Sequence, residues 1–118
     1  GNPHAAPIWG IWMDGALLFG TGAQSRKARN FRHNANVVMH LESGDDVVIL
    51  EGRVTPLKDA DQLRRFGVAY AAKYDLNPTE DSAEGADFWI FTPQTALTWQ
   101  EHDFPKTATR WTFASDAQ

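Results

Sequence analysis

The chain has no cysteine among its 118 residues. Disulfide bridges, thiolate metal sites and cysteine nucleophiles are therefore excluded, and the absence fits a reducing compartment. Basic residues are also few: 11 Lys and Arg stand against 15 Asp and Glu, which gives a net charge of −4. A chain this acidic is poorly suited to general binding of nucleic acid. No apolar run approaches the roughly 20 residues of a membrane-spanning helix and no signal peptide is visible, so we expect a cytoplasmic protein.

Aromatic side chains, in contrast, are plentiful, with 5 Trp and 7 Phe. Aromatic surface often lines ligand sites or subunit interfaces. A chain of 118 residues has the size of one domain and can bury a core without covalent staples. We therefore predict a single domain over residues 1–118.

The first third of the sequence predicts a hairpin followed by a short helix. Residues 4–13 predict a strand with bulky groups on both faces, and Trp12 is expected in the core. Asp14-Gly15 is a strong signal for a two-residue turn into a second strand over 16–21. A helix is predicted over 25–33, and Asn34 is expected to end it in the left-handed conformation.

The remaining sequence predicts more strands and one longer helix. Strands are expected over 37–42 and 46–54, with Gly52 marking a bulge or a close backbone contact. The longer helix begins after Asp59, in a pattern typical of a capping box, and runs to Tyr74. The other expectations are a loop over 79–86, strands over 87–92 and 95–101 separated by Pro93, a loop over 102–106 and a last strand over 109–113. Six or so antiparallel strands with two inserted helices predict a mainly β fold, closed into a small barrel because closure removes exposed edges.

Positive charge is concentrated in residues 21–30 and just after them. Four of the eleven basic residues lie within seven positions: Arg26, Lys27, Arg29 and Arg32. Ser25 is a natural N-cap, and a helix start offers unpaired N–H groups and the positive end of the helix dipole. Cations are disfavoured there unless an anion is present, so the pattern predicts a phosphate site. The alternative is a solvated helix face whose cations balance nearby acids.

Some polar residues outside this stretch invite a functional interpretation. His4 and His40 have the pKa range for acid–base chemistry, but the pattern gives neither a partner, so structural roles are expected. Glu51 lies inside a predicted strand, where a charge needs a partner, and Arg29 is our hypothesis for that partner.

Two further groups are expected to be structural. Tyr70, Lys73 and Tyr74 follow one helix face, which is more typical of core packing than of chemistry, although Lys73 has the reach for an acidic cofactor tail. His102 and Asp103 are adjacent potential ligands without a third, so we expect no metal site.

Five short motifs carry a more specific signal. They are Pro7-Ile8-Trp9-Gly10, Asp14-Gly15, Ser25-Arg26-Lys27-Ala28-Arg29-Asn30, Val37-Val38 and Glu51-Gly52. Together they resemble the flavin-binding split-barrel superfamily, which contains the pyridoxamine 5′-phosphate oxidase-like proteins and the actinobacterial flavin/deazaflavin oxidoreductases. Residues 69–74 and 101–105 look like one uncharacterised branch of that superfamily.

The resemblance implies a six- to seven-stranded antiparallel split β-barrel with Greek-key-like connections. It also implies a homodimer with the cofactor in a groove between the subunits. The implied site residues are Thr21, Ser25, Arg26 and Lys27 for the phosphate end, Pro7, Ile8 and Trp9 for the ring, and Trp99, Arg110 and Trp111 as contributions across the subunit interface. From the residues alone, Trp9 is as well suited to the core as to a ring-stacking position.

Two departures from the family pattern bear on function. Family members usually begin with a helix and a strand that pairs with the 4–13 segment, and we expect that this sequence starts after both. The C-terminal substrate signature of true pyridoxamine phosphate oxidases is not found, so vitamin B6 synthesis is not expected.

FMN and the deazaflavin coenzyme F-420 are equally compatible with the sequence. The deazaflavin carries a glutamate tail that would need further cations, and the candidates are Arg29, Arg32, Lys73 and Lys106. Either cofactor would supply hydride transfer to or from a small organic substrate that the sequence does not identify, so a flavin- or deazaflavin-dependent oxidoreductase is expected. No catalytic side chain is predicted. The alternatives are a carrier that binds flavin, haem or a tetrapyrrole without turnover, and an acidic dimerisation domain without a cofactor.

Overall fold

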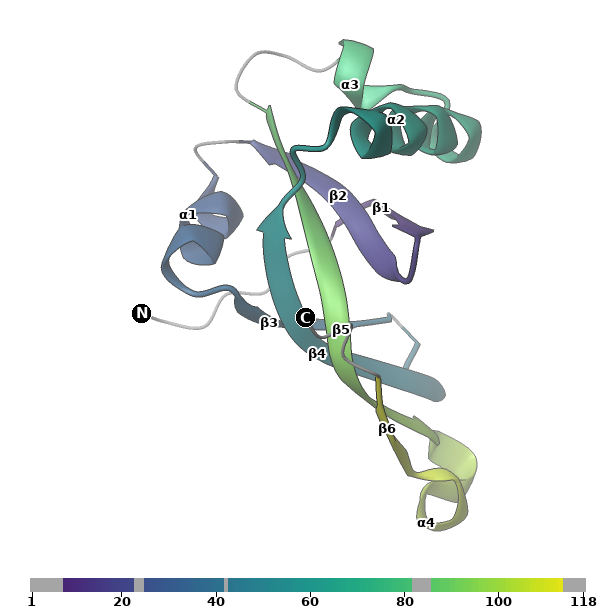
Figure 1. Cartoon of the computed structure of the whole chain (residues 1–118). Helices are drawn as coiled ribbons and strands as arrows, with labels where there is room; N and C mark the ends of the chain where they lie inside the picture. The colour runs from purple at the N-terminus through teal and green to yellow at the C-terminus, as the bar shows by residue number, and fades with distance from the viewer. Residues whose placement is uncertain (1–7, 23–24, 42, 82–85, 114–118) are drawn as a thin grey trace. The chain divides into compact units, whose positions relative to one another are not determined.

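The computed structural model describes residues 8–22, 25–41, 43–81 and 86–113. In chain order the elements are β1 (Gly10–Met13), β2 (Ala16–Gly22), α1 (Arg26–His33), β3 (Asn36–His40), β4 (Asp46–Pro56), α2 (Ala60–Tyr74), α3 (Pro78–Asp81), β5 (Ala86–Gln100), the 3-10 turn η1 (Glu101–Asp103), α4 (Phe104–Thr107) and β6 (Thr109–Thr112) (Figure 1). The strands form one six-stranded sheet in the order β1-β2-β5-β4-β3, with β6 paired to β5. The mainly β, antiparallel fold with inserted helices is thus confirmed.

The chain divides into two compact units. Unit 1 comprises Gly1–Ala35 and Val54–Phe91, and unit 2 comprises Asn36–Arg53 and Thr92–Gln118. Strand β5 therefore begins in one unit and ends in the other.

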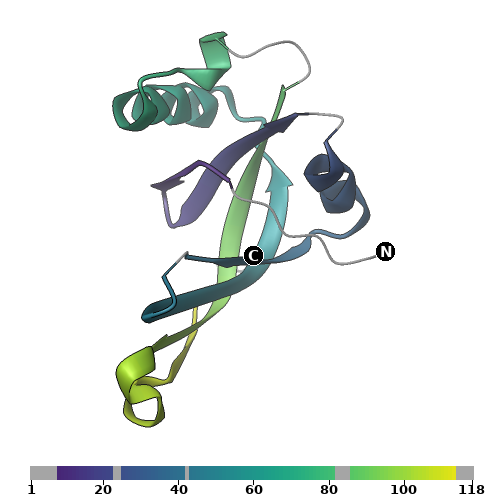
Figure 2. The same ribbon diagram turned by 180° about the vertical axis from the view of Figure 1, so that it is seen from behind.

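In unit 1, β1 and β2 form the hairpin that Asp14-Gly15 predicts. Asp14 and Gly15 have φ angles of 53° and 77°, and Met13 pairs with Ala16 directly across the turn. Positive φ at both central positions is the geometry of a type I′ turn, whose twist matches that of the flanking strands. Figure 2 shows this hairpin from behind, with α1 following the end of β2.

The β2–β5 pair carries one helix on each of its faces. Leu18 pairs with Ile90 on the face toward α2, where the buried side chains of Leu18 and Phe66 share one cluster. The neighbouring pair, Phe19 and Trp89, points to the opposite face because successive strand residues alternate. There the ring of Phe31 in α1 packs edge-on, with centroids 5.8 Å from Phe19 and 5.2 Å from Trp89.

Both predicted helix starts and the predicted end of the first helix at His33 are confirmed, but the left-handed conformation predicted for Asn34 is wrong. Ser25 Oγ accepts from the Ala28 N–H at 3.1 Å, and Asp59 Oδ1 accepts from the Gln62 N–H at 2.8 Å. Asn34, however, caps α1 in an extended conformation with φ −146° and ψ 111°. Its N–H still bonds the Asn30 carbonyl, and the chain then passes directly into β3 without needing a left-handed residue.

The predicted strand over 4–13 is shorter in the structure, and the predicted burial of Trp12 is wrong. Within the described part, the strand begins at Gly10, and Ile8 and Trp9 lie before it. Residues 4–7 lie outside the described residues. Trp12 is 52% exposed, because β1 is the edge of the sheet order and only its other face packs on the core through Ile11.

The two predicted C-terminal strands are a single one, since β5 continues through Pro93. The ladder of β5 with β2 ends at Phe91 and the ladder with β6 begins at Thr95, so Pro93 lies where neither of these ladders needs its missing N–H. Two predicted loops contain helical turns, α3 at 78–81 and η1 with α4 at 101–107. Of the two alternatives predicted for Gly52, the bulge is absent from the β3–β4 ladder, where Gly52 pairs regularly with Val37, and the close backbone contact stays a prediction.

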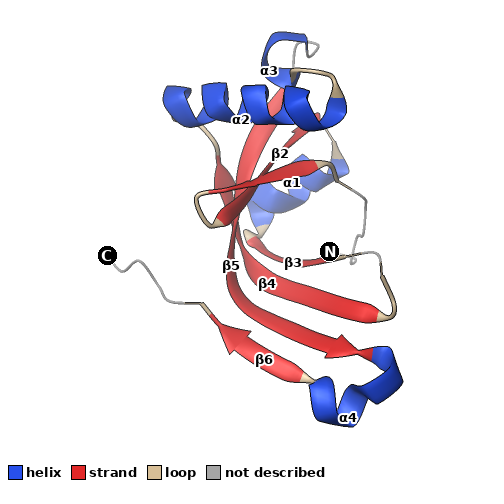
Figure 3. Ribbon diagram, turned by 90° about the vertical axis from the view of Figure 1, so that its right-hand side faces the viewer, coloured by secondary structure: helices blue, strands red, loops and turns tan. Residues whose placement is uncertain are grey.

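In unit 2, β5 leads through η1 and α4 into β6, which returns along it (Figure 3). A single hydroxyl fastens this reversal: Thr107 Oγ1 accepts from the Gln100 N–H at 2.8 Å and contacts the Asp103 carbonyl at 2.8 Å. All four residues of β6 are exposed. None of the helices in the described ranges has the length and apolar composition that crossing a membrane requires.

Candidate functional site

The start of α1 has the features of an anion site. Strand β2 ends at Gly22, and the Ser25 N–H donates to the Gly22 carbonyl at 3.0 Å, just before the helix begins. The first helical turn contains no acidic residue, and Arg26 and Lys27 are its first two residues. The positive end of the helix dipole and two cations therefore coincide, an arrangement that favours a bound anion.

The side chains of α1 divide between the sheet and solvent. Ala28 is fully buried, whereas Arg26 and Arg29 are exposed. Arg32 forms an ion pair with Asp87 at 2.9 Å. The alternative of locally balanced charge thus holds for Arg32, near the far end of the helix. Arg26 and Lys27, at its start, stay the residues that the sequence predicts for phosphate.

Two buried polar groups lie on the face of the β2–β5 pair that α1 covers. The Thr21 hydroxyl and the Trp89 indole N–H are both buried, and neither has a hydrogen-bond partner among the described residues. Thr21 pairs with Asp87 and Phe19 with Trp89, so Thr21 and Trp89 are diagonal neighbours on one face. Buried polar groups are normally satisfied, so this pair of groups is where a hydrogen-bonding ligand would find partners.

The polar groups at the start of α1 are chemically suited to a phosphate-bearing cofactor. A phosphate offers acceptor oxygens, and the groups present are donors: backbone N–H groups of a helix start, Arg26, Lys27 and the Thr21 hydroxyl. The sequence predicted Thr21 as a site residue but not Trp89. The only indication for Trp89 was that the chain is rich in aromatic residues.

Of the predicted ring-side residues, Pro7 lies outside the described residues, and Ile8 and Trp9 precede β1. Gly10 pairs with Phe19, so the chain leaving β1 toward Trp9 points to the end of the hairpin at which β2 reaches Thr21 and α1 begins. The hairpin therefore brings the predicted ring-side and phosphate-side residues toward the same end of one supersecondary unit.

Trp9 is neither in the core nor isolated. It is 61% exposed, and its ring stacks on that of Tyr74 with centroids 4.8 Å apart and planes 15° apart. Behind Tyr74 lies Tyr70, whose ring centroid is 4.5 Å away and which is buried in the core. Burial raises the pKa of the Tyr70 phenol, and the neighbouring Tyr74 raises it further, so Tyr70 stays neutral.

The residues predicted to act across a subunit interface belong to unit 2. Trp99 in β5 donates its indole N–H to Glu101 Oε2 at 2.9 Å, and its ring meets Phe104 edge-on at 5.5 Å. Arg110 and Trp111 lie on β6, both exposed, opposite Leu97 and Ala96. Whether they meet a cofactor stays a prediction.

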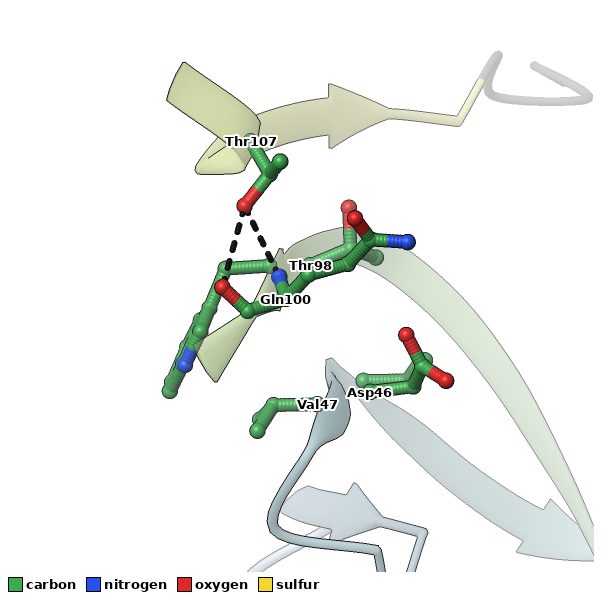
Figure 4. A pocket seen from close by; sticks show the side chains of 7 residues that line it. Asp46, Val47, Thr98, Gln100 and Thr107 are labelled. Atoms are coloured by element: carbon green, nitrogen blue, oxygen red, sulfur yellow. Dashed lines mark hydrogen bonds between the residues drawn. The ribbon is translucent and has the colours of Figure 1, made fainter. Parts of the chain in front are cut away.

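Trp99 also lines a cavity of about 440 Å³ in unit 2. Its other lining residues are Asp46, Val47, Val48, Thr98, Gln100 and Thr107. Figure 4 shows Thr107 bonded to the backbone of Gln100 on one side of this cavity, and the Asp46 side chain rising from β4 on the other. The lining combines valine side chains, the Trp99 indole, hydroxyl and amide groups and the Asp46 carboxylate, and these seven residues include no cation to balance a phosphate.

The remaining sequence candidates have local partners. Glu51 Oε1 accepts from the Thr95 hydroxyl at 2.9 Å, so the partner that the structure shows is a hydroxyl instead of the predicted Arg29. His40 Nδ1 lies 2.9 Å from the Leu41 carbonyl, whereas His4 lies outside the described residues. Across the described ranges, no three acidic or histidine side chains gather as metal ligands around His102 and Asp103 or elsewhere.

Similar folds occur in several solved structures. The conserved hypothetical protein Rv2991 from Mycobacterium tuberculosis is 25% identical, with a TM-score of 0.72 over 99% of this chain and 80% of that one. General Stress Protein 26 from Bacillus anthracis is 19% identical, with a TM-score of 0.68 over 94% of this chain and 80% of that one. A heme binding protein from Mycobacterium smegmatis is 15% identical, with a TM-score of 0.72 over 95% of this chain and 48% of that one.

No curated protein matches the chain significantly in sequence. A family model does match, and it is the one described as Pyridoxamine 5′-phosphate oxidase, over residues 1–100. That range contains every motif on which the split-barrel resemblance depends. The hairpin, the capped start of α1 and the family model agree, and the chain belongs to the pyridoxamine 5′-phosphate oxidase family.

Proposed function

We propose that the protein binds a flavin-type cofactor and works as an oxidoreductase on a small organic substrate. The observation that carries this proposal is the Ser25-capped start of α1, where Arg26 and Lys27 meet a helix N-terminus without a single acidic residue in the first turn. In this proposal the start of α1 and Thr21 hold the cofactor phosphate, and Ile8 and Trp9 lie beside the ring. The bound cofactor would supply hydride transfer, while the protein's residues bind and orient it.

FMN is the cofactor that the contacts support better. The glutamate tail of F-420 would need cations beyond the phosphate cradle, and the candidates for it were Arg29, Arg32, Lys73 and Lys106. Arg32 is paired with Asp87, and Lys73 Nζ donates to the Gly10 carbonyl at 3.2 Å. Two of the four candidates thus have protein partners, which lowers the positive charge open to a second anionic group.

A homodimer is part of the proposal, because unit 2 exposes large apolar side chains that a second copy would cover. These are Val38, Leu41, Leu97, Phe104, Trp111 and Phe113, each at least 39% exposed. Exposed apolar surface of this kind marks protein–protein contact sites. The predicted contributions of Trp99 and Arg110 would come from the same unit.

Titration of FMN and of F-420 into the cofactor-free protein tests the proposal. We expect FMN to bind, and Arg26→Ala and Lys27→Ala each to weaken binding at least about tenfold, because a charge-assisted hydrogen bond contributes roughly 1.5–3 kcal/mol. Lys58→Ala is the matched control, since Lys58 is an exposed cation of the same unit outside α1. If the Arg26→Ala, Lys27→Ala double variant binds both cofactors as tightly as the natural sequence, the proposed phosphate site is wrong.

A second candidate is a carrier that holds flavin, haem or a tetrapyrrole without turnover. The fold shared with the heme binding protein from Mycobacterium smegmatis motivates it, although a shared fold does not transfer a ligand. The visible spectrum of the purified protein identifies the bound group, because flavin, deazaflavin and haem absorb in different bands, and a flavin carrier differs from the oxidoreductase only in the absence of turnover. A Soret band with no flavin binding would favour the carrier.

A further inference from the structure

Two donors at the end of α2 converge on one backbone carbonyl near the start of β1. Lys73 Nζ donates to the Gly10 carbonyl oxygen at 3.2 Å, and the Tyr74 hydroxyl donates to the same oxygen at 3.3 Å. A carbonyl oxygen has two lone pairs and can accept both bonds. Segments more than sixty residues apart in the sequence are thereby joined at a single atom.

The strand pattern explains why this oxygen is available. Met13 and Ala16 flank the two-residue turn and form a hydrogen-bonded pair, and such pairs alternate along an antiparallel ladder. Two residues before Met13, Ile11 forms the next hydrogen-bonded pair, with Leu18. Gly10 and Phe19 therefore form a non-hydrogen-bonded pair, and the carbonyl of Gly10 points away from β2. Lys73 and Tyr74 bond this oxygen on the side of β1 that faces away from β2.

The residue before Gly10 is held by the same tyrosine. The indole of Trp9 stacks nearly parallel on the Tyr74 ring, with planes 15° apart. Lys73 Nζ lies 5.0 Å from the centroid of that ring, within range of a cation–π attraction. Tyr74 therefore fixes both the ring of Trp9 and the backbone beside it.

This support continues into the core of unit 1. Tyr74 contacts Tyr70, Tyr70 meets Phe66 edge-on at 5.5 Å, and Phe66 is fully buried. Trp9, which stacks on the outer side of Tyr74, is 61% exposed. One side of its indole is thus packed on a fixed base while much of the remaining ring surface is open to a planar ligand.

We propose that Lys73 and Tyr74 are positioning residues for the ring of the cofactor. They hold Trp9 and the Gly10 carbonyl in the orientation that a flat ring would meet, whereas the start of α1 holds the phosphate. This inference rests on the proposed flavin-type function and assigns the ring end of the site to α2. Preorganised groups of this kind raise affinity because their ordering is not left to the binding event.

Comparison of riboflavin with FMN separates the two ends of the site, because riboflavin has the ring but no phosphate. Lys73→Met and Tyr74→Phe each remove one of the two hydrogen bonds. We expect each to weaken riboflavin and FMN binding by the same factor, about threefold to tenfold for one lost hydrogen bond. Tyr74→Leu, which also removes the stacking partner of Trp9, should weaken both further and reduce the shift of the flavin absorption band on binding.

The controls are matched to these changes. Lys58→Met makes the same substitution at an exposed lysine before α2 and should leave both affinities unchanged. Lys73→Arg keeps a donor and should restore most of the loss. Arg26→Ala should weaken FMN binding alone, and urea unfolding confirms that each variant is folded.

The possible outcomes separate the two proposals. If the unmodified protein binds neither FMN nor riboflavin nor F-420, the proposed function fails and this inference fails with it. If Arg26→Ala weakens FMN binding while folded Lys73→Met and Tyr74→Phe bind riboflavin as the natural sequence does, the phosphate site stands and the positioning role is wrong.

Discussion

The two units of the chain bury their apolar side chains to very different degrees. Of the twelve buried apolar residues in the described ranges, eleven belong to unit 1 and only Ala96 belongs to unit 2. Unit 2 nevertheless holds six of the ten large apolar side chains that are exposed. The ion pairs that the structure shows among described residues, such as Arg65 with Asp14, also lie in unit 1.

The difference separates two tasks. Unit 1 has its own core, and the candidate phosphate and ring residues stand directly on it: Thr21 on β2, Ser25 before α1, and Trp9 on Tyr74. Among the described residues of unit 2, Ala96 is the only hydrophobic residue in the buried set, and six large apolar side chains are exposed. Sites that need precise geometry are better placed on packed elements, and surfaces that face a partner need exposed apolar groups.

The largest effect should come from opening the core of unit 1. Phe66→Ala removes a fully buried ring and should lower the free energy of unfolding by about 3–5 kcal/mol. Val68→Ala, at a 61% exposed position of the same helix, should change it by less than about 0.5 kcal/mol. Urea unfolding measures both. Equal losses would show that unit 1 does not depend on this core.

A charge on the exposed surface of unit 2 should act on assembly instead of folding. Trp111→Glu should raise the dissociation constant of the proposed dimer at least about thirtyfold, as expected for a loss of about 2 kcal/mol at an aromatic contact. Trp12→Glu is the control, since Trp12 is about as exposed, 52% against 55%, but lies in unit 1. Sedimentation over a range of protein concentrations measures the dissociation constant of each variant. Equal effects of the two changes, or a monomer at all concentrations, would contradict the role given to unit 2.

The two capped helices of unit 1 offer a paired comparison. Ser25→Ala and Asp59→Ala each remove a side chain that accepts from a backbone N–H, and each should lower the stability by about 1 kcal/mol. Only Ser25→Ala should also weaken FMN binding, because only that helix start belongs to the proposed site. Thermal unfolding and FMN titration of both variants measure the two effects. Loss of FMN affinity in Asp59→Ala as well would point to a general effect of helix stability.

Removal of the buried hydroxyl of Thr21 should have a smaller effect. It should not lower the stability of the protein, but it should lower the affinity for FMN. Without cofactor, Thr21→Val removes a polar group that has no partner and should leave the stability unchanged or raise it by up to about 1 kcal/mol. FMN affinity should fall. Thr95→Val in unit 2 removes a hydroxyl that donates to Glu51 and should lower the stability slightly. If Thr21→Val destabilises more than Thr95→Val, Thr21 has a structural partner.

The smallest effect should come from the ion pairs on the exposed side of α2. Hydrogen bonds from Arg64 and then Arg65 lower the pKa of the Asp61 carboxyl below its ordinary 3.8. A lowered pKa in the folded state means that the contribution to stability exists above the ordinary pKa and is lost as the pH falls through the folded value. Asp61→Asn should therefore melt slightly lower than the natural sequence at neutral pH, and the difference should vanish well below pH 3.8 and in high salt. A difference that persists in acid would mean that Asp61 acts through something other than its charge.

Local signals in the sequence predicted local structure correctly. The turn at Asp14-Gly15 and the caps Ser25 and Asp59 are determined by residues only a few positions away, so no tertiary information was needed. The proposed phosphate end of the site comes from the same stretch of sequence, and it stays a prediction that the titration tests.

The errors involve neighbours that the sequence does not show. Trp12 has the composition of a core residue, but β1 is an edge strand, and sheet order cannot be obtained from the pattern of one strand. Pro93 interrupts a strand in general but is tolerated between two ladders. The contacts of Lys73 and Tyr74 with Gly10 join segments far apart in the chain, so the sequence indicated only a helix face there.

The pairing of β2 with β5 has a consequence for how the protein folds. Leu17 pairs with Phe91, and the whole of unit 2's first segment lies between them in the sequence. Ordering so long an intervening chain before the contact is made has an entropic cost, and such non-local pairing slows folding. During synthesis, β2 cannot pair with β5 until residues 86–91 have left the ribosome, so Phe19 lacks its neighbour Trp89 until then. That interval is the stage at which a chaperone would be most useful to this chain.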